Sequence, residues 1–194
     1  MRNFSAIEAR QRNMAFNTVN AKAILMEKVA SKSPPLETVF DIFLSYRADD
    51  IDVVMGVYED LIRRRYTVYL DRIMDPQLDR EKVTKDTADI LRKRLIQSKS
   101  LFYASTEISS GSKWMPWELG FEDGYRGKAA IVPITDQSVF VGIEFVAMYP
   151  KIEPDAAGLW VFEADSQTLI SRYEIWRDAI PKRKCGMPTC PIPK

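Results

Sequence analysis

The residues best placed to do chemistry in this sequence are Trp114 and Glu118. They are four positions apart, so on a helix they lie on one face, one turn from each other. Ser112 is a suitable N-cap for that helix, and Glu118 then stands near its N-terminus, where the macrodipole favours an ionised carboxylate. A carboxylate beside an aromatic ring suits a flat cationic ligand. Periodicity alone favours a plainer interpretation, a core tryptophan beside a glutamate that complements the helix dipole.

The absence of histidine excludes several kinds of site. The chain has no histidine, and its two cysteines, Cys185 and Cys190, both stand in the tail KRKCGMPTCPIPK. Catalysis by Ser-His-Asp or Cys-His groups is therefore excluded, and a single cysteine pair is too few for a structural zinc site. We expect two free thiols and no metal, with any chemistry coming from carboxylates, hydroxyls, Lys, Arg or a cofactor.

Short apolar runs alternate with amphipathic helical patterns through the middle of the chain. This alternation predicts βαβ units and an α/β fold with a mainly parallel sheet and helices on both faces. The polar segment 71–80 is expected to be a loop. The predicted strands are 39–45, 66–70, 100–105 and 129–134, and the predicted helices are 51–62, 81–97 and 114–125.

The two ends of the chain are less regular. Residues 1–33 predict a helix that ends before Pro34 and Pro35. After residue 135 we expect a strand at 159–162 and a helix at 166–180. The inward side chains of that last helix would include Leu169, Ile170, Tyr173 and Trp176. The expected organisation is an N-terminal helical extension (1–35), a central domain (36–140) and a C-terminal extension (141–194) that completes or flanks it.

Polar residues stand where the predicted strands end. In a parallel sheet, ligands bind beyond the carboxyl ends of the strands. Ser45, Tyr46 and Arg47 end the first strand, and Asp71 follows the second. Any one of them is more simply explained as an ordinary surface residue, and only the set as a whole favours a site.

Composition and motifs exclude further classes. The 194 residues include 28 Lys and Arg against 27 Asp and Glu, a net charge of +1, so no overall field favours nucleic acid or an anionic membrane. No apolar run approaches the roughly eighteen residues of a membrane span, and the N-terminus lacks the apolar stretch of a secretory signal. Neither a dinucleotide-binding glycine motif nor a P-loop is present. We expect a cytoplasmic protein without nucleic-acid or membrane partners.

Several segments, in order, resemble the signature boxes of Toll/interleukin-1 receptor (TIR) domains, especially the NAD⁺-cleaving bacterial type. The resemblance covers about residues 38–135 and implies a flavodoxin-like fold with strand order 2-1-3-4-5. The fifth strand is not evident, although the region around Trp160 is a candidate for it or for an extension. The matching segments are 41–47, 68–71, 100–105, 114–118 and 130–134.

The resemblance implies an activity and a set of residues. In NAD⁺-cleaving members the catalytic glutamate matches Glu118, with NAD⁺ as substrate and no further cofactor. We expect Glu118 at the mouth of a crevice, stabilising an oxocarbenium-like transition state, and rank Glu122, one turn further on, well below it. The expected substrate-binding residues are Ser45, Tyr46, Arg47, Asp71 and Trp114. Water would release ADP-ribose, whereas attack by an adenine nitrogen would give a cyclic isomer.

Stand-alone bacterial TIR proteins similar to this chain are linked to anti-phage defence such as Thoeris, in which a separate effector senses the product. One alternative is a non-catalytic scaffold that associates with its own kind through the 71–80 loop and the N-terminal helix. Another is a nucleoside deoxyribosyltransferase-like enzyme, which also uses a glutamate on an N-glycosidic bond. The context of Glu118 favours the NAD⁺-cleaving enzyme over the scaffold, and Ser45-Tyr46-Arg47 argues against the transferase.

Overall fold

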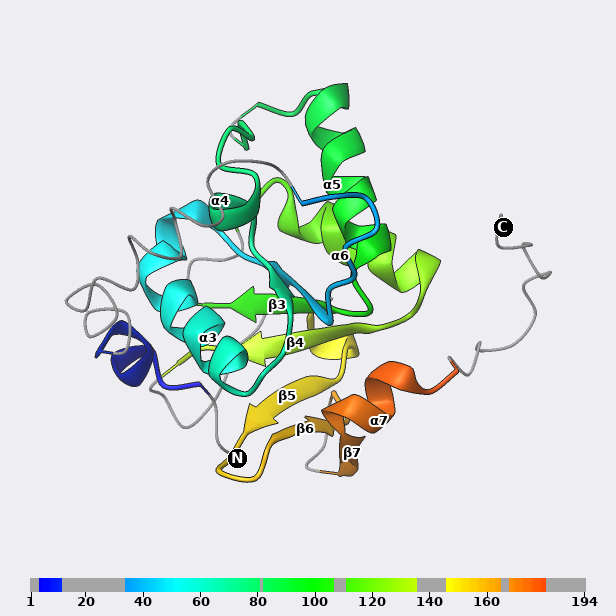
Figure 1. Cartoon of the computed structure of the whole chain (residues 1–194). Helices are drawn as coiled ribbons and strands as arrows, with labels where there is room; N and C mark the ends of the chain where they lie inside the picture. The colour runs from blue at the N-terminus through cyan, green and yellow to red at the C-terminus, as the bar shows by residue number, and fades with distance from the viewer. Residues whose placement is uncertain are drawn as a thin grey trace.

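A seven-stranded sheet forms the centre of the computed structural model, which describes residues 4–11, 34–80, 82–106, 111–135, 146–164 and 168–180 (Figure 1). The strand order is β2-β1-β3-β4-β5-β6-β7. Strands β2 to β5 are parallel, and β6 and β7 continue the sheet in antiparallel pairs. The strands are β1 (Ile42–Ser45), β2 (Val68–Tyr69), β3 (Leu101–Ser105), β4 (Ala129–Pro133), β5 (Lys151–Pro154), β6 (Leu159–Phe162) and β7 (Leu169–Arg172).

Helices cover both faces of the sheet, as expected for the flavodoxin-like α/β fold. One apolar cluster joins the sheet to α3, to Tyr173 of α7 and to residues 4–9, and a second joins it to α5 and α6. The helices are η1 (Ala48–Asp50), α3 (Ile51–Arg63), α4 (Asp71–Met74), α5 (Lys85–Gln97), α6 (Met115–Tyr125), η3 (Val146–Met148) and α7 (Tyr173–Asp178), and residues 6–11 are also helical. The predicted order 2-1-3-4-5 is confirmed for the parallel part of the sheet.

The helix predicted at 81–97 begins later than expected. Thr84 is its N-cap, with the Thr84 hydroxyl accepting a hydrogen bond from the backbone N–H of Thr87 at 3.1 Å, so α5 starts at Lys85. Val83, which the predicted range included, precedes the helix and is 65% exposed. The predicted loop 71–80 also contains the short helix α4.

The helix predicted at 166–180 is wrong in its first half. Residues 169–172 instead form β7, which pairs with β6, and only Tyr173–Asp178 is helical. Leu169 and Ile170 were expected to face inward but are 48% and 45% exposed, because they lie on an outer strand of the sheet. Tyr173 is fully buried, as predicted. The fifth strand is Lys151–Pro154, and the region around Trp160 forms β6.

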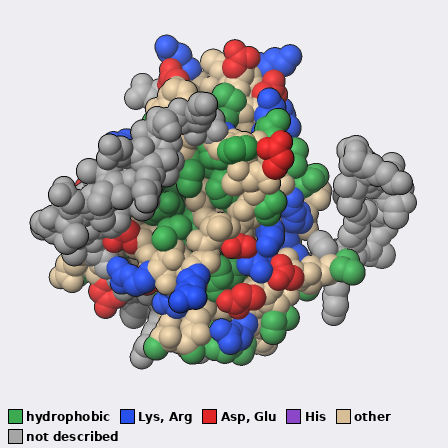
Figure 2. Space-filling model, in the orientation of Figure 1, with side chains coloured by type: hydrophobic (Ala, Val, Ile, Leu, Met, Phe, Trp, Pro, Cys, Tyr) green, Lys and Arg blue, Asp and Glu red, His purple; other side chains and the backbone are tan. Residues whose placement is uncertain are grey.

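The chain ends are described only in part. Residues 6–11 are helical, as predicted, whereas 12–33, Cys185 and Cys190 lie outside the described residues. Strands β5–β7 belong to the same sheet as the central strands, and the division at residues 35 and 140 stays a prediction. Among the described residues, no helix has the length and apolarity to span a membrane, and no acidic, Cys or His cluster could hold a metal. On the face shown in Figure 2, charges of both signs are interspersed.

Candidate active site

Glu118 lies in the first turn of α6 and points toward the carboxyl end of β1. The backbone N–H of Met115 donates to the Ser112 hydroxyl at 3.2 Å, and Pro116 occupies the first turn, where few internal hydrogen bonds are lost. The Ser45 hydroxyl, at the last position of β1, donates to Oε2 of Glu118 at 2.5 Å. The strand end and the helix start therefore hold the two side chains predicted to share a site.

Arg80 links Glu118 to Asp71. Its Nη1 donates to Oδ2 of Asp71 and its Nη2 donates to Oε1 of Glu118, each at 2.7 Å. The guanidinium is thus a planar cation held between two carboxylates, and it is only 18% exposed. Asp71, the first residue of α4, also accepts a hydrogen bond from the backbone N–H of Arg72.

Trp114 fixes the position of Arg80 and lines the same site. Its indole Nε1 donates to the backbone carbonyl of Arg80 at 2.8 Å, and the Arg80 guanidinium carbon lies 6.0 Å from the centre of the Trp114 ring. The ring is almost fully buried, at 5% exposed. The aromatic ring and the Glu118 carboxylate together stabilise a flat cation at this place, here the guanidinium of Arg80.

Burial and the neighbouring charges act against each other on the pKa of Glu118, and the net result is a raised pKa. Burial raises the pKa of Glu118, whereas the charge of Arg80 and the hydrogen bond from Ser45 act against that rise. Burial favours the neutral form of Arg80, but Glu118 and Asp71 outweigh it and raise the Arg80 pKa above its usual value. The site holds two carboxylates against one guanidinium, so with both ionised it favours an added cation.

Tyr46 joins the network through Asp71. Its hydroxyl is hydrogen-bonded to Asp71, and burial followed by the Asp71 charge raises its pKa well above the usual value. The phenol therefore remains a neutral hydrogen-bond donor at any physiological pH.

Arg47 faces a neighbouring part of the same sheet edge. Its Nε donates to Oδ2 of Asp49 at 2.8 Å, and its guanidinium lies against Gly111, where an added Cβ would be 2.3 Å from Nη1. The contacts described above join Ser45, Tyr46, Asp71, Trp114 and Glu118 but not Arg47.

Comparison with known proteins gives a family. No family model matches the chain. Over 175 residues it is 36% identical to a protein named "Probable 3' cyclic ADP-D-ribose synthase ThsB'" from Bacillus cereus (strain MSX-D12), a match that covers 86% of this chain and 89% of the relative. This chain belongs to the ThsB'-type TIR family. It is also 29% identical over 98 residues to a "Putative cyclic ADP-D-ribose synthase TIR2" from Cytobacillus dafuensis, which covers 50% of this chain and 26% of that protein.

In this ThsB'-type TIR domain, Glu118 is less accessible than expected. We expected it at the mouth of a crevice, but its exposed fraction is 0%. Its two carboxylate oxygens are both occupied, Oε2 by the Ser45 hydroxyl and Oε1 by the Arg80 guanidinium. Glu118 is therefore enclosed in a polar network that includes Arg80, a side chain of the segment between α4 and α5.

Sequence reasoning missed Arg80. The only sequence signal for it is indirect: a parallel sheet that brings Asp71 and Glu118 together needs a nearby cation, and the segment after Asp71 offers several. Glu122, ranked below Glu118, is also fully buried, and it forms an ion pair with Arg126, with 3.7 Å between Nη1 and Oε1. Burial raises the pKa of Glu122 to about 8.

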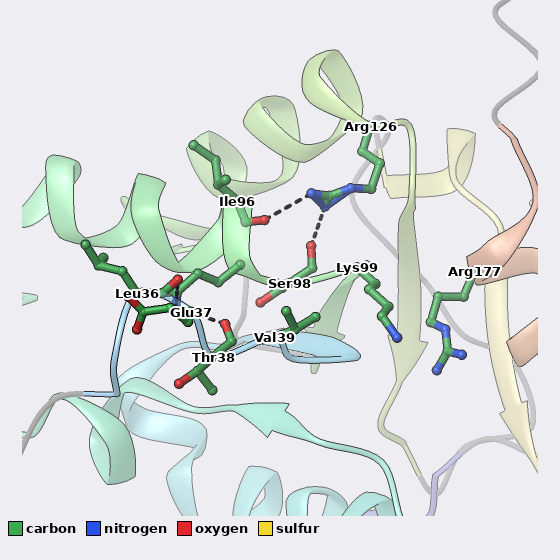
Figure 3. A pocket seen from close by; sticks show the side chains of 10 residues that line it. Leu36, Glu37, Thr38, Val39, Ile96, Ser98, Lys99, Arg126 and Arg177 are labelled. Atoms are coloured by element: carbon green, nitrogen blue, oxygen red, sulfur yellow. Dashed lines mark hydrogen bonds between the residues drawn. The ribbon is translucent and has the colours of Figure 1, made fainter. Parts of the chain in front are cut away.

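The structure also has a pocket of about 480 Å³ at the opposite edge of the sheet (Figure 3). It lies beside the residues that precede β1 and β3, and none of the predicted site residues lines it. Arg126 projects there and donates to the backbone carbonyls of Ile96 and Ser98, which ties the end of α5 to the end of α6. These contacts give Arg126 a structural role at the C-terminus of a helix.

Proposed function

We propose that this chain cleaves the nicotinamide–ribose bond of NAD⁺ and converts the remainder into a cyclic ADP-ribose-type signal in bacterial anti-phage defence. The observation that carries the proposal is a buried carboxylate, Glu118, paired with a planar cation at the carboxyl edge of a parallel sheet. The names of the two relatives, both cyclic ADP-D-ribose synthases, support it.

The chemistry needs only one acidic side chain. Nicotinamide in NAD⁺ is a pyridinium and departs as a neutral base, so no second carboxylic acid is required to protonate it, unlike in ordinary glycosidases. Glu118 accepts hydrogen bonds from the ribose hydroxyls and stabilises the positive charge that develops at the anomeric carbon. Ser45, which donates to Oε2, holds the carboxylate in position.

Arg80 occupies the place that the substrate cation requires. Its guanidinium is flat, positively charged and 6.0 Å from the centre of the Trp114 ring, features that a bound pyridinium shares, and its hydrogen bond to Oε1 of Glu118 is the one that a ribose hydroxyl would replace. Substrate entry therefore exchanges one cation for another beside Glu118, which limits the electrostatic cost of opening the site. During this exchange Arg80 remains bound to Asp71, and the hydrogen bond from Tyr46 holds Asp71 in place.

The remaining proposals concern the product, the role of Arg47 and the partners of the protein. The oxocarbenium-like intermediate reacts with an adenine nitrogen of the same molecule to give a cyclic product, or with water to give ADP-ribose. We assign Arg47 to a ribose or phosphate contact, since a guanidinium suits bidentate binding of phosphate. We further propose that the protein acts in the cytoplasm, self-associates and passes its product to a separate effector.

Substitution of Glu118 tests the proposal. Glu118→Gln keeps the shape of the side chain but removes its charge and turns one acceptor oxygen into an N–H donor, so NAD⁺ consumption should fall by about 10³-fold or more, with a melting curve that shows a folded protein at the assay temperature. Glu122→Gln, one turn along α6, is the matched control and should retain turnover. Chromatography with mass detection identifies the products. Near-normal NAD⁺ cleavage by Glu118→Gln would remove Glu118 from its catalytic role.

The burial of Glu118 also supports the alternative of a non-catalytic scaffold. A carboxylate with no exposed surface cannot contact a substrate in this conformation. The same assay separates the two functions. A scaffold predicts no NAD⁺ loss from the wild-type protein at any concentration, whereas the enzyme predicts loss that depends on Glu118.

A further inference from the structure

The pocket at the amino edge of the sheet has one wall, residues 36–39, that is fastened to the end of α5. The side-chain amide of Gln97 donates from Nε2 to the backbone carbonyls of Pro35, Leu36 and Thr38, at 2.8, 3.0 and 2.9 Å. The backbone N–H of Phe40 donates in turn to the carbonyl of Gln97 at 2.9 Å. A single glutamine thus holds the whole segment, so the pocket is formed before any ligand arrives.

One end of this pocket is apolar. The side chains of Leu36, Val39 and Ile96 line it, and each of them is at least 46% exposed. They gather on one side of the pocket, away from Arg177 (Figure 3). Three large aliphatic side chains that face the same cavity offer a surface that an apolar group covers with a gain in free energy.

The other end carries more positive charge than its partners neutralise. Nζ of Lys99 and Nη1 of Arg177 both donate to the same atom, Oδ1 of Asp41, at 3.2 and 2.8 Å. Arg177 also pairs with Asp178, whose side chain is 57% exposed. The Lys99 side chain is itself 45% exposed, so its shared ion pair contributes little and Lys99 is available to another anion.

Arg126 adds a third cation to this end of the pocket. Its guanidinium donates to the backbone carbonyls of Ile96 and Ser98, which are neutral. Its ion-pair partner, Glu122, is fully buried, and burial raises the Glu122 pKa to about 8, so this acid is largely protonated at neutral pH. Of the described residues that line the pocket only Glu37 is acidic, and it lies beside Leu36 at the apolar end (Figure 3).

From this arrangement we infer that the pocket binds a small organic anion, a molecule with an apolar body and one anionic group. The volume of about 480 Å³ lies within the range of about 300–1,000 Å³ that small-molecule sites occupy. The apolar body contacts the three aliphatic side chains, and the anionic group binds at Lys99 beside the two guanidiniums. Glu118 lies at the opposite end of α6, so binding here leaves the active site free, and the inference does not depend on the proposed reaction.

Two related dyes test the inference in the full-length protein without NAD⁺. Anilinonaphthalene sulfonate has an apolar aromatic body and one sulfonate, and N-phenylnaphthylamine has nearly the same body without the charge. From fluorescence titration we expect the wild type to bind the sulfonate dye about tenfold more tightly than the neutral dye. Inorganic sulfate, which lacks the apolar body, should compete about a hundredfold more weakly than the sulfonate dye.

Two substitutions at exposed side chains separate the two ends of the pocket. Lys99→Gln should weaken binding of the sulfonate dye about fivefold and leave the neutral dye within about twofold, the effect of one exposed charge. Ile96→Ser should weaken both dyes about tenfold, because it removes apolar surface that either dye covers. Lys93→Gln in α5 and Ile62→Ser in α3, outside the pocket, are the matched controls and should change neither affinity. All four variants should keep the NAD⁺ turnover of the wild type.

Equal affinity of the wild type for the two dyes would overturn the inference, because the pocket would then not recognise the anionic group. Unchanged binding of the sulfonate dye in Lys99→Gln or in Ile96→Ser would also overturn it, since the dye would then bind elsewhere on the protein. Inorganic sulfate that competes as well as the dye would reduce the pocket to a simple anion site, which contradicts the role of the aliphatic side chains.

Discussion

Glu122 is a buried acid that the proposed reaction does not use, and it makes stability depend on pH. Burial raises its pKa from 4.5 to about 8, so between these values the folded chain holds a proton that the unfolded chain releases. Stability from this group is complete below pH 4.5 and is lost as the pH rises to about 8. Glu118, whose pKa burial also raises, acts with the same sign.

In Glu122→Gln the free energy of unfolding should therefore decrease less between pH 4.5 and about 8 than it does in the wild type. We expect the variant to gain about 2–4 kcal/mol relative to the wild type between pH 5 and pH 8, measured by urea denaturation at several pH values. Glu8→Gln, at an exposed glutamate, is the surface control. Identical pH profiles for Glu122→Gln and wild type would show that Glu122 is ionised in the folded protein.

Single residues also mark the limit of the sequence analysis. The regular spacing of Trp114 and Glu118 placed them on one helical face, and the resemblance to TIR domains singled out Glu118. The gathering of strand ends at one edge predicted that Ser45, Tyr46 and Asp71 lie near them. Arg80 was missed because its role depends on how the segment after Asp71 folds back, which no periodic pattern encodes. The full burial of Glu118, which pairs with Arg80, was missed as well.

Among the elements, the docking of helix 6–11 on α3 gives a direct test. Gly56→Ala places a methyl group 2.0 Å from the backbone oxygen of Ala9, which cannot rotate away. We expect helix 6–11 to be displaced, a loss of about 1–3 kcal/mol despite the higher helix propensity of alanine, and faster hydrogen exchange at the Thr135 amide, which donates to the carbonyl of Phe4. Gly124→Ala in α6, where an added Cβ meets nothing within 4 Å, should be neutral or stabilising. Unchanged exchange at Thr135 in Gly56→Ala would argue against this packing.

The elements that the sequence predicted well and badly differ in a physical way. Strands β1, β3 and β4 are buried on both faces, so they appear as continuous apolar runs in the sequence. In β7, Leu169 and Ile170 happen to stand at helical spacing from Tyr173 and Trp176, which favoured a helix. Residues 169–172 form a strand because they pair with β6. Such pairing joins separate segments, so the sequence of one segment does not predict it.

At the scale of the whole molecule, the proposed reaction requires a conformational change that exposes the buried Glu118 to NAD⁺. Arg80 belongs to the surface segment between α4 and α5, so a second molecule that binds this segment in its open form would draw the equilibrium toward an accessible Glu118. The net charge of +1 imposes no long-range repulsion between copies. We therefore expect NAD⁺ turnover per molecule to rise with protein concentration, measured from low micromolar to high micromolar protein at constant substrate.

Arg80→Gln separates opening from association in that experiment. The variant lacks the cation that covers Glu118, so its turnover per molecule should depend less on concentration. It should also unfold more easily, because Glu118 and Asp71 are left buried without their guanidinium, at a cost of about 3 kcal/mol. Arg72→Gln, at an exposed arginine of α4, is the matched control and should keep the wild-type dependence. Turnover per molecule that stays constant with concentration in the wild type would mean that a single chain opens its own site, and Arg80 would then be displaced by the substrate alone.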